Sequence, residues 1–190
     1  MDKKYIKVVF LGESGVGKTS LINRYINNSY KESEVSTFNA SNFSKTIKYE
    51  GKEYTFDIWD TPGSDAFKSL TKIFLKESKI FVLVYDTTDK KSFLNLQYWL
   101  DYILEEFGSK SFIILIGNKS DLINKRQVKE SDGSKFANII KALFIQTSAK
   151  TNDNWSLNFE NLLKDYLTIN KKEIPEIEDT DDYLDDLLLY

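Results

Sequence analysis

The stretch Gly12-Glu13-Ser14-Gly15-Val16-Gly17-Lys18-Thr19 fits the spacing G-x-x-x-x-G-K-[ST]. It follows an apolar run at residues 5–11 and precedes a run of helical character at residues 21–26. This order is the strand–loop–helix context of a phosphate-binding loop. Glycines let successive backbone N–H groups point inward at an anion, and the following helix adds the positive end of its dipole. With these flanks, a phosphate site is favoured over a glycine-rich turn that matches by chance.

Two side chains in this stretch predict the chemistry of the ligand. Lys18 is expected to reach the outer phosphates, and the hydroxyl of Thr19 to hold Mg²⁺. The loop therefore predicts a nucleotide with its metal.

Composition narrows the class of protein. The 190 residues are 41% hydrophobic and 29% charged, as in a globular domain, and the net charge of −3 predicts no nucleic-acid partner. The sequence contains neither cysteine nor histidine, which excludes disulfides, thiolate zinc sites, cysteine nucleophiles and histidine acid–base chemistry. No signal peptide or membrane-spanning run is visible, so the expected compartment is the cytoplasm.

Strand-like and helix-like segments alternate, which predicts an α/β fold with a mostly parallel sheet and helices on both faces. Residues 41–49 and 52–59 flank Glu50-Gly51 and predict one antiparallel hairpin. Apolar runs at 80–85 and 111–116 predict buried strands, and a short strand is expected at 144–147. Apolar residues at helical spacing predict three later helices: Phe93, Leu96, Leu100, Ile103, Leu104 and Phe107; Phe136, Ile139, Ile140 and Leu143; Trp155, Phe159, Leu162, Leu163 and Tyr166. Residues 27–39 read as a loop.

One domain is expected over residues 1–170. From 171 to 190 the sequence is rich in Asp and Glu, which predicts an acidic tail or linker.

Polar residues follow three other predicted strands at the edge where ligands bind in open α/β sheets. They are Asp60 to Gly63, Asn118 to Asp121, and Ser148 to Lys150. The Asp121 carboxylate could accept from both N1–H and N2–H₂ of guanine, whereas adenine lacks the second donor. The N–H of Ala149 could meet guanine O6.

These four segments, in this order, resemble the motifs of the Ras superfamily of small GTPases. Residues 67–71, 84–89 and 92–100 are similar to the Rab branch, whose members act in vesicle traffic. The resemblance covers about residues 5–167. It implies the G domain of P-loop NTPases, with a six-stranded sheet, a GTP/GDP site with Mg²⁺, and slow GTP hydrolysis.

The resemblance also implies roles for individual residues. Thr37 would bind Mg²⁺ and sense the γ-phosphate, Tyr30 would lie beside guanine, and Lys119 would lie along the purine face. The implied metal ligands are Thr19, Thr37 and, through water, Asp60. The residues implied in hydrolysis are Lys18, Thr37, Gly63 and Ser64. The implied nucleotide contacts are Glu13, Ser14, Gly15, Val16, Gly17, Lys18, Thr19, Ser20, Tyr30, Thr37, Gly63, Asn118, Lys119, Asp121, Ser148, Ala149 and Lys150.

The sequence departs from the family pattern at several positions. Ser64 stands where the family has the glutamine that orients the attacking water, so hydrolysis is expected to be slow. Pro62 stands where Rabs generally have alanine, and we expect it to be compatible with nucleotide binding because the N–H of Gly63 stays available. Asp65-Ala66 replaces the more usual Glu-Arg, which predicts activators and exchange factors that differ from those of other Rabs. Of three aromatic residues that Rabs present to effectors, Trp59 and Phe74 are here; Asn42 takes the third place, with Phe43 one residue later and on the other face unless a bulge intervenes.

The expected partners are effector, exchange-factor and activator proteins, which would read switch I and switch II. The prenylated cysteines of Rabs have no counterpart, so the chain either works without a lipid anchor, recruited to endomembranes by partners, or is part of a longer protein. Two functional alternatives stay open: a pseudo-GTPase scaffold or regulatory domain that holds nucleotide without meaningful hydrolysis, and a different P-loop enzyme such as a nucleoside kinase or ATPase.

Overall fold

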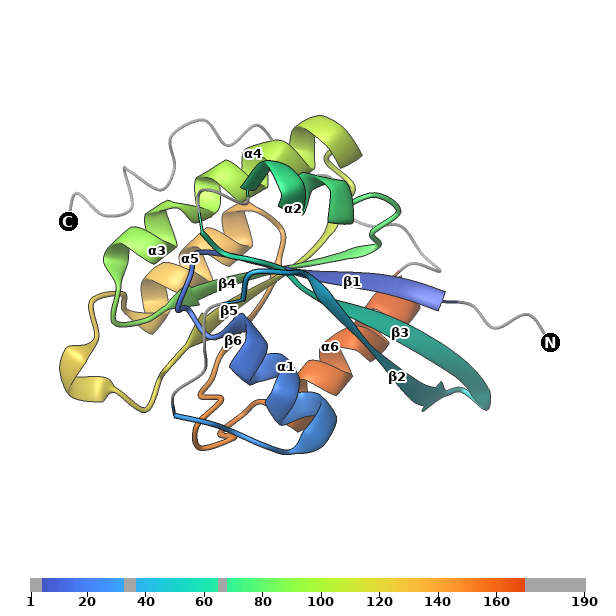
Figure 1. Cartoon of the computed structure of the whole chain (residues 1–190), viewed down its shortest axis with the longest axis horizontal. Helices are drawn as coiled ribbons and strands as arrows, with labels where there is room; N and C mark the ends of the chain where they lie inside the picture. The colour runs from blue at the N-terminus through green and yellow to red at the C-terminus, as the bar shows by residue number, and fades with distance from the viewer. Residues whose placement is uncertain (1–4, 33–36, 65–67, 170–190) are drawn as a thin grey trace.

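The computed structural model describes residues 5–32, 37–64 and 68–169 (Figure 1). The predicted tail at 171–190 and the pair Asp65-Ala66 lie outside the described residues, and so does part of the predicted loop at 27–39.

A six-stranded sheet forms the centre of the fold, in the order β2-β3-β1-β4-β5-β6. The antiparallel pair β2–β3 runs from Ser41 opposite Asp60 to Tyr49 opposite Lys52, and every other pair of neighbours is parallel. The predicted sheet with one antiparallel hairpin is thus confirmed. The strands are β1 (Tyr5–Leu11), β2 (Ser41–Tyr49), β3 (Lys52–Asp60), β4 (Ile80–Asp86), β5 (Phe112–Asn118) and β6 (Leu143–Gln146).

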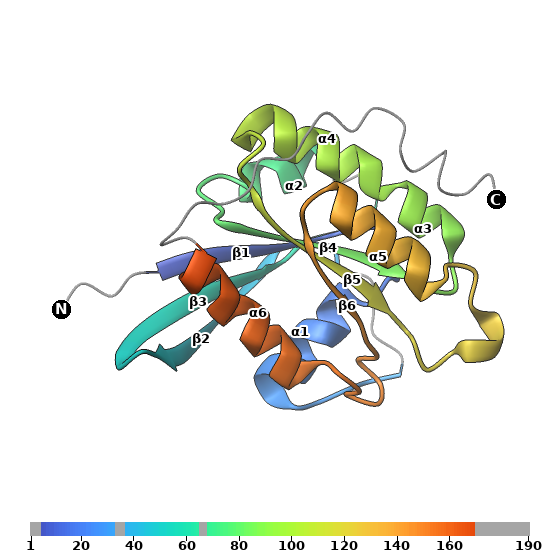
Figure 2. The ribbon, with the colours of Figure 1, turned by 180° about the vertical axis from the view of Figure 1, so that it is seen from behind.

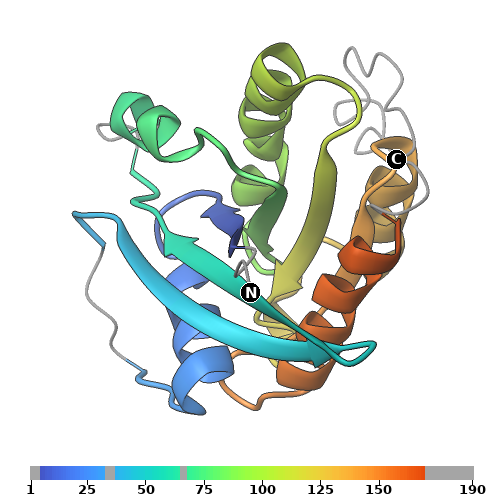
Figure 3. The same ribbon diagram turned by 90° about the vertical axis from the view of Figure 1, so that its right-hand side faces the viewer.

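Helices cover both faces of the sheet, with α1 and α6 on one side and α2, α3, α4 and α5 on the other (Figures 1, 2 and 3). The helices are α1 (Lys18–Asn27), α2 (Lys68–Phe74), α3 (Lys90–Leu94), α4 (Leu96–Phe107), the 3₁₀ helix η2 (Ile123–Lys125), α5 (Glu130–Ile139) and α6 (Ser156–Ile169). In the described part of the chain, no helix has the length and apolar character needed to cross a bilayer.

The two faces have separate cores because side chains alternate along each strand. In β1, Val8 and Phe10 pack with α1 and α6, whereas Val9 and Leu11 pack beneath α4 and α5. This double burial explains the continuous apolar runs of the central strands.

Several predicted boundaries were wrong. The stripe at 93–107 is divided between α3 and α4, with Asn95 between them. Leu143, predicted as part of a helix, is the first residue of β6. Helix α5 ends at Ile139, and the chain then turns back toward the sheet. Trp155 precedes α6, and Asn27 is the last residue of α1. Periodicity identified these core residues but not the points where the helices end.

The hairpin register shows where the predicted effector aromatics lie. The β2–β3 ladder is continuous, with Asn42 opposite Trp59 and Phe43 opposite Ile58. Phe43 packs against the core beneath α1 and α6, whereas the Trp59 ring lies 5.6 Å from that of Phe74 on the opposite face. No bulge interrupts this described ladder, so Asn42 rather than an aromatic ring accompanies Trp59, as predicted.

Candidate nucleotide-binding site

The loop between β1 and α1 has a backbone that only glycine adopts easily. The φ angle is 142° at Gly12 and 96° at Gly17. A Cβ atom would meet the carbonyl oxygen of Val84 at Gly12 and the side-chain amide of Asn118 at Gly17. Gly17 also occupies the N-cap of α1, where it has no side chain to engage the first-turn N–H groups. That arrangement suits a bound phosphate.

Lys18 extends along the same loop. Its Nζ donates to the carbonyl oxygens of Gly12, at 2.7 Å, and Glu13, at 3.0 Å. The residue is only 6% exposed, and this burial lowers the pKa of the ammonium to about 8 from 10.5. The carboxylates of Asp60 and Glu13 offset part of this lowering, and a bound phosphate would add further negative charge beside the buried ammonium.

Three side chains with oxygen atoms, those of Thr19, Thr37 and Asp60, meet next to Lys18. The Thr19 hydroxyl lies 2.8 Å from the Thr37 hydroxyl and donates to Asp60 Oδ2 at 2.6 Å. Hydroxyl and carboxylate oxygens suit Mg²⁺, which commonly uses one or two carboxylates and completes its shell with phosphate and water. Among the described residues no cluster of three or more His, Cys, Asp or Glu side chains could hold a metal. The hydroxyls of Thr19 and Thr37 and the carboxylate of Asp60 fit an ion that arrives with phosphates.

The segment after β3 packs against the phosphate loop. Thr61 Oγ1 donates to the carbonyl oxygen of Phe10 at 2.6 Å, which fixes this segment to β1. A Cβ on Gly63 would lie 2.5 Å from both the Glu13 carbonyl oxygen and Lys18 Nζ. Glycine is therefore needed at 63 for this close approach. Ser64, the next residue, is half-buried.

Asn118 joins the two ends of the site. Its Nδ2 donates to the Val16 carbonyl oxygen at 2.8 Å, and its Oδ1 accepts from the Ala149 N–H at 3.2 Å. One buried amide thus connects the phosphate loop to the loop after β6. Asp121, three residues along, lines the same pocket.

A second set of contacts links the end of α1 to the loop after β6. Arg24 donates through Nε to the Ala149 carbonyl oxygen at 2.9 Å and through Nη2 to the Lys150 carbonyl oxygen at 3.1 Å. Its guanidinium lies 5.9 Å from the centre of the Tyr30 ring. Lys150 Nζ forms an exposed ion pair of 2.8 Å with Glu32.

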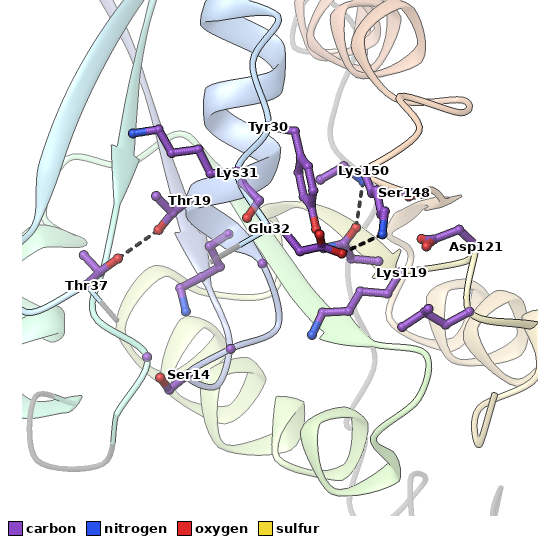
Figure 4. Close-up of a pocket in the computed structure, with 18 of the residues that line it drawn as sticks. Ser14, Thr19, Tyr30, Lys31, Glu32, Thr37, Lys119, Asp121, Ser148 and Lys150 are labelled. Atoms are coloured by element: carbon purple, nitrogen blue, oxygen red, sulfur yellow. Dashed lines mark hydrogen bonds and ion pairs between the residues drawn. The ribbon is translucent and has the colours of Figure 1, made fainter. Parts of the chain in front are cut away.

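These segments enclose one pocket of about 300 Å³. In Figure 4, Thr19 and Thr37 lie at one side of it, and Lys119, Asp121 and Ser148 lie at the other. The structure brings these predicted residues into its lining: Ser14, Gly15, Gly17, Lys18, Thr19, Ser20, Tyr30, Thr37, Gly63, Asn118, Lys119, Asp121, Ser148, Ala149 and Lys150.

Four predicted residues are not part of that lining. Glu13, Val16 and Asp60 support it from behind, since they accept the hydrogen bonds of Lys18, Asn118 and Thr19. Ser64 follows the lining residue Gly63.

The lining residues that sequence reasoning missed are Lys31, Glu32, Thr61 and Leu122. Each lies within two positions of a predicted residue: Lys31 and Glu32 follow Tyr30, Thr61 follows Asp60, and Leu122 follows Asp121. Their closeness in sequence to predicted residues is the signal that could have identified them as lining residues.

The family comparison agrees with this arrangement. The sequence profile of the Ras family matches residues 7–168. The protein belongs to the Ras family. Ras-family proteins are small GTPases that bind GTP and GDP with Mg²⁺ and interact with regulators and effectors. The match spans the whole described pocket, from the phosphate loop to the loop after β6.

Proposed function

We propose that this protein is a GTP-dependent molecular switch of the Rab branch that works in vesicle and membrane traffic. The observation that carries the guanine-nucleotide part of the proposal is the single pocket shared by the phosphate loop and Asp121. The switch occupies residues 1–170, with 171–190 as an acidic tail or linker. It is cytoplasmic and is recruited to endomembranes by partner proteins.

Each end of the pocket has its own task. At the base end, Asp121 accepts from N1–H and N2–H₂ of guanine, and the Ala149 N–H faces O6. At the phosphate end, Lys18 replaces its contacts with backbone carbonyls by contacts with phosphate oxygens. Thr19, Thr37 and Asp60 hold Mg²⁺, directly or through water. When bound, the ion neutralises phosphate charge.

The change of state depends on Thr37 and Gly63. Both lie close to Lys18 or Thr19, where the γ-phosphate of GTP would be gripped. In the GDP state both segments are released from that contact, and partners distinguish the two states through switch I and switch II. Trp59 and Phe74 form part of the partner surface, with Asn42 in the third position.

Hydrolysis is slow because Ser64 replaces the glutamine that orients the attacking water. A serine side chain is two heavy atoms shorter, so it cannot reach both the water and the phosphate. The same substitution favours a second candidate function, a scaffold or regulatory pseudo-GTPase that retains nucleotide without turning it over.

Single-turnover hydrolysis of GTP, with the bound nucleotide identified before and after, tests the proposal. We expect purified protein to contain guanine nucleotide, ATP to compete poorly, and phosphate to be released more slowly than in small GTPases with glutamine at this place. Ser64→Gln should accelerate release, and Ser64→Ala serves as its matched control.

Retained GTP with no release over hours would favour the scaffold. ATP that competes as well as GTP would overturn both functions. A rate equal to that of glutamine-bearing small GTPases, unchanged in Ser64→Ala, would refute the role given to Ser64.

A further inference from the structure

The turn that follows β4 lies against the end of β5 and the first residue after it, Asn118 and Lys119. β4 ends at Asp86, which is opposite Asn118, the last residue of β5, in the parallel register. Within the described chain, Asp86, Thr87 and Thr88 are not part of the pocket lining, whereas Asn118 and Lys119 are. The turn can therefore influence nucleotide only through the residues that it holds.

The turn holds the backbone of Lys119 in an unfavourable conformation. Lys119 has φ of 64°, in the left-handed region that side-chain-bearing residues adopt at a cost. The Thr87 N–H donates to the Asn118 carbonyl oxygen at 3.0 Å, and Thr87 Oγ1 donates to the Lys119 carbonyl oxygen at 3.2 Å. These two bonds fix the loop from the side away from the pocket.

The same turn holds the side chain of Lys119. Lys119 Nζ lies 2.7 Å from Asp86 Oδ2, with the aspartate side chain 11% exposed and the lysine side chain 34% exposed. The other carboxylate oxygen, Oδ1, accepts from Thr88 N at 2.8 Å and Thr88 Oγ1 at 2.7 Å. Thr88 therefore orients the carboxylate, and the carboxylate orients the ammonium.

We propose that Asp86 is a positioning residue for nucleotide retention, which acts by holding the Lys119 side chain at the base end of the pocket before nucleotide arrives. A lysine side chain has four rotatable bonds, and restricting them costs entropy. If the restriction is already present in the free protein, less of that cost falls on binding. The inference rests on the guanine site proposed above.

Release of fluorescently labelled GDP tests this role. Asp86→Asn keeps an oxygen for Thr88 but removes the charge that holds Lys119, so the dissociation rate should rise about fivefold. Asp89→Asn is the matched control. Asp89 lies in the same turn and is exposed, and its side chain caps α3 by accepting from Lys91 N at 3.0 Å. Its substitution should change the rate less than twofold.

A double-mutant cycle separates positioning from a general loosening of the turn. In a Lys119→Met background, Asp86→Asn should add less than twofold, because the group on which it acts is gone. An equal increase in both backgrounds, or a rate for Asp86→Asn no faster than for Asp89→Asn, would overturn the proposal.

Thr88→Val provides a second route if Asp86→Asn does not fold. It removes the hydroxyl that orients Oδ1 and should raise the dissociation rate about twofold, again only when Lys119 is present; no increase would count against the proposal. Failure of the unmodified protein to bind labelled GDP would instead refute the guanine site itself.

Discussion

The base end and the phosphate end of the pocket are held together by different kinds of contact. At the base end, Asn118 Nδ2 donates to the Val16 carbonyl oxygen through a hydrogen bond that a nucleotide need not break, whereas the Ala149 N–H, which donates to Asn118 Oδ1, would turn to guanine O6. At the phosphate end, Lys18 and Thr19 contact carbonyl, hydroxyl and carboxylate oxygens. Phosphate and metal would replace several of these contacts.

This difference has a functional consequence. A base end that Asn118 already ties to the phosphate loop can select a ligand, because a wrong base leaves the Asp121 carboxylate and the Ala149 N–H poorly paired. A phosphate end whose contacts are exchanged can report which phosphates are present, because its segments adopt another arrangement when the ligand changes. On the proposed function, selection would depend mainly on the base end and sensing mainly on the phosphate end.

The largest expected effect comes from removing the connection between the ends. Asn118→Ala removes the partners of Val16 and Ala149 together, in a site where Asn118 is 2% exposed. We expect affinity for GDP to fall by about 100-fold, consistent with two buried hydrogen bonds. Isothermal titration calorimetry measures the loss, with Asn124→Ala, on the exposed helix η2, as control. Affinity within fivefold of the unmodified protein would show that the connection is dispensable.

The second-largest effect should come from a substitution at the phosphate end of the pocket. Gly63→Ala places a methyl group against the Glu13 carbonyl and Lys18. We expect single-turnover GTP hydrolysis to fall about tenfold and GDP dissociation to rise less, by about threefold, because GDP lacks the γ-phosphate proposed to lie beside Gly63 but still contacts Lys18. An increase of tenfold or more in the GDP dissociation rate would show that the substitution disturbs the binding of GDP as much as it disturbs hydrolysis.

A third test concerns pH. The proposed contact with phosphate needs the charged form of Lys18. In the free protein, burial lowers the pKa of Lys18 to about 8. Affinity for GDP should therefore be greatest below pH 8 and fall about eightfold between pH 7.5 and 9.0, with proton uptake on binding. Calorimetry in buffers of different ionisation enthalpy detects that uptake. Without nucleotide the sign reverses. The unfolded chain binds more protons than the folded one between about pH 8 and 10.5, so Lys18 makes stability rise with pH over that window.

The smallest effect should come from the exposed pair Glu32–Lys150, which closes the base end from outside. Glu32→Gln should raise the GDP dissociation rate about twofold in low salt, because solvent-exposed ion pairs contribute little. In 1 M salt the unmodified protein and the variant should release GDP alike. A difference that persists in high salt would mean that Glu32 acts other than through charge.

Sequence could predict much of the pocket because its motifs are contiguous and each follows a strand. Glycine spacing revealed the phosphate loop, and the period of two in strands placed Phe43 on the face away from Trp59. The fold class followed from the alternation of strands and helices.

Other features depend on contacts between distant segments. Arg24 and Glu32 meet the loop after β6 only because the chain brings α1 beside it, and although Glu32 is near Tyr30 in sequence, nothing local predicts the contact of either residue with that loop. Asp86 lies in the run 84–89 that resembles the Rab branch, but its contact with Lys119 depends on the register of β4 with β5. Helix ends were misplaced at Leu143 and Trp155 because core periodicity continues after the end of α5 and begins before the start of α6.

The shared amide of Asn118 limits how this scaffold could be redesigned. A protein engineer who wished to recognise another heterocycle could vary the contacts around Asp121. Replacing Asn118 would also disturb the cradle for the phosphates through Val16. On the proposed function, a substitution at Asn118 would change base preference and phosphate binding together. Neither property could then be altered at this position without affecting the other.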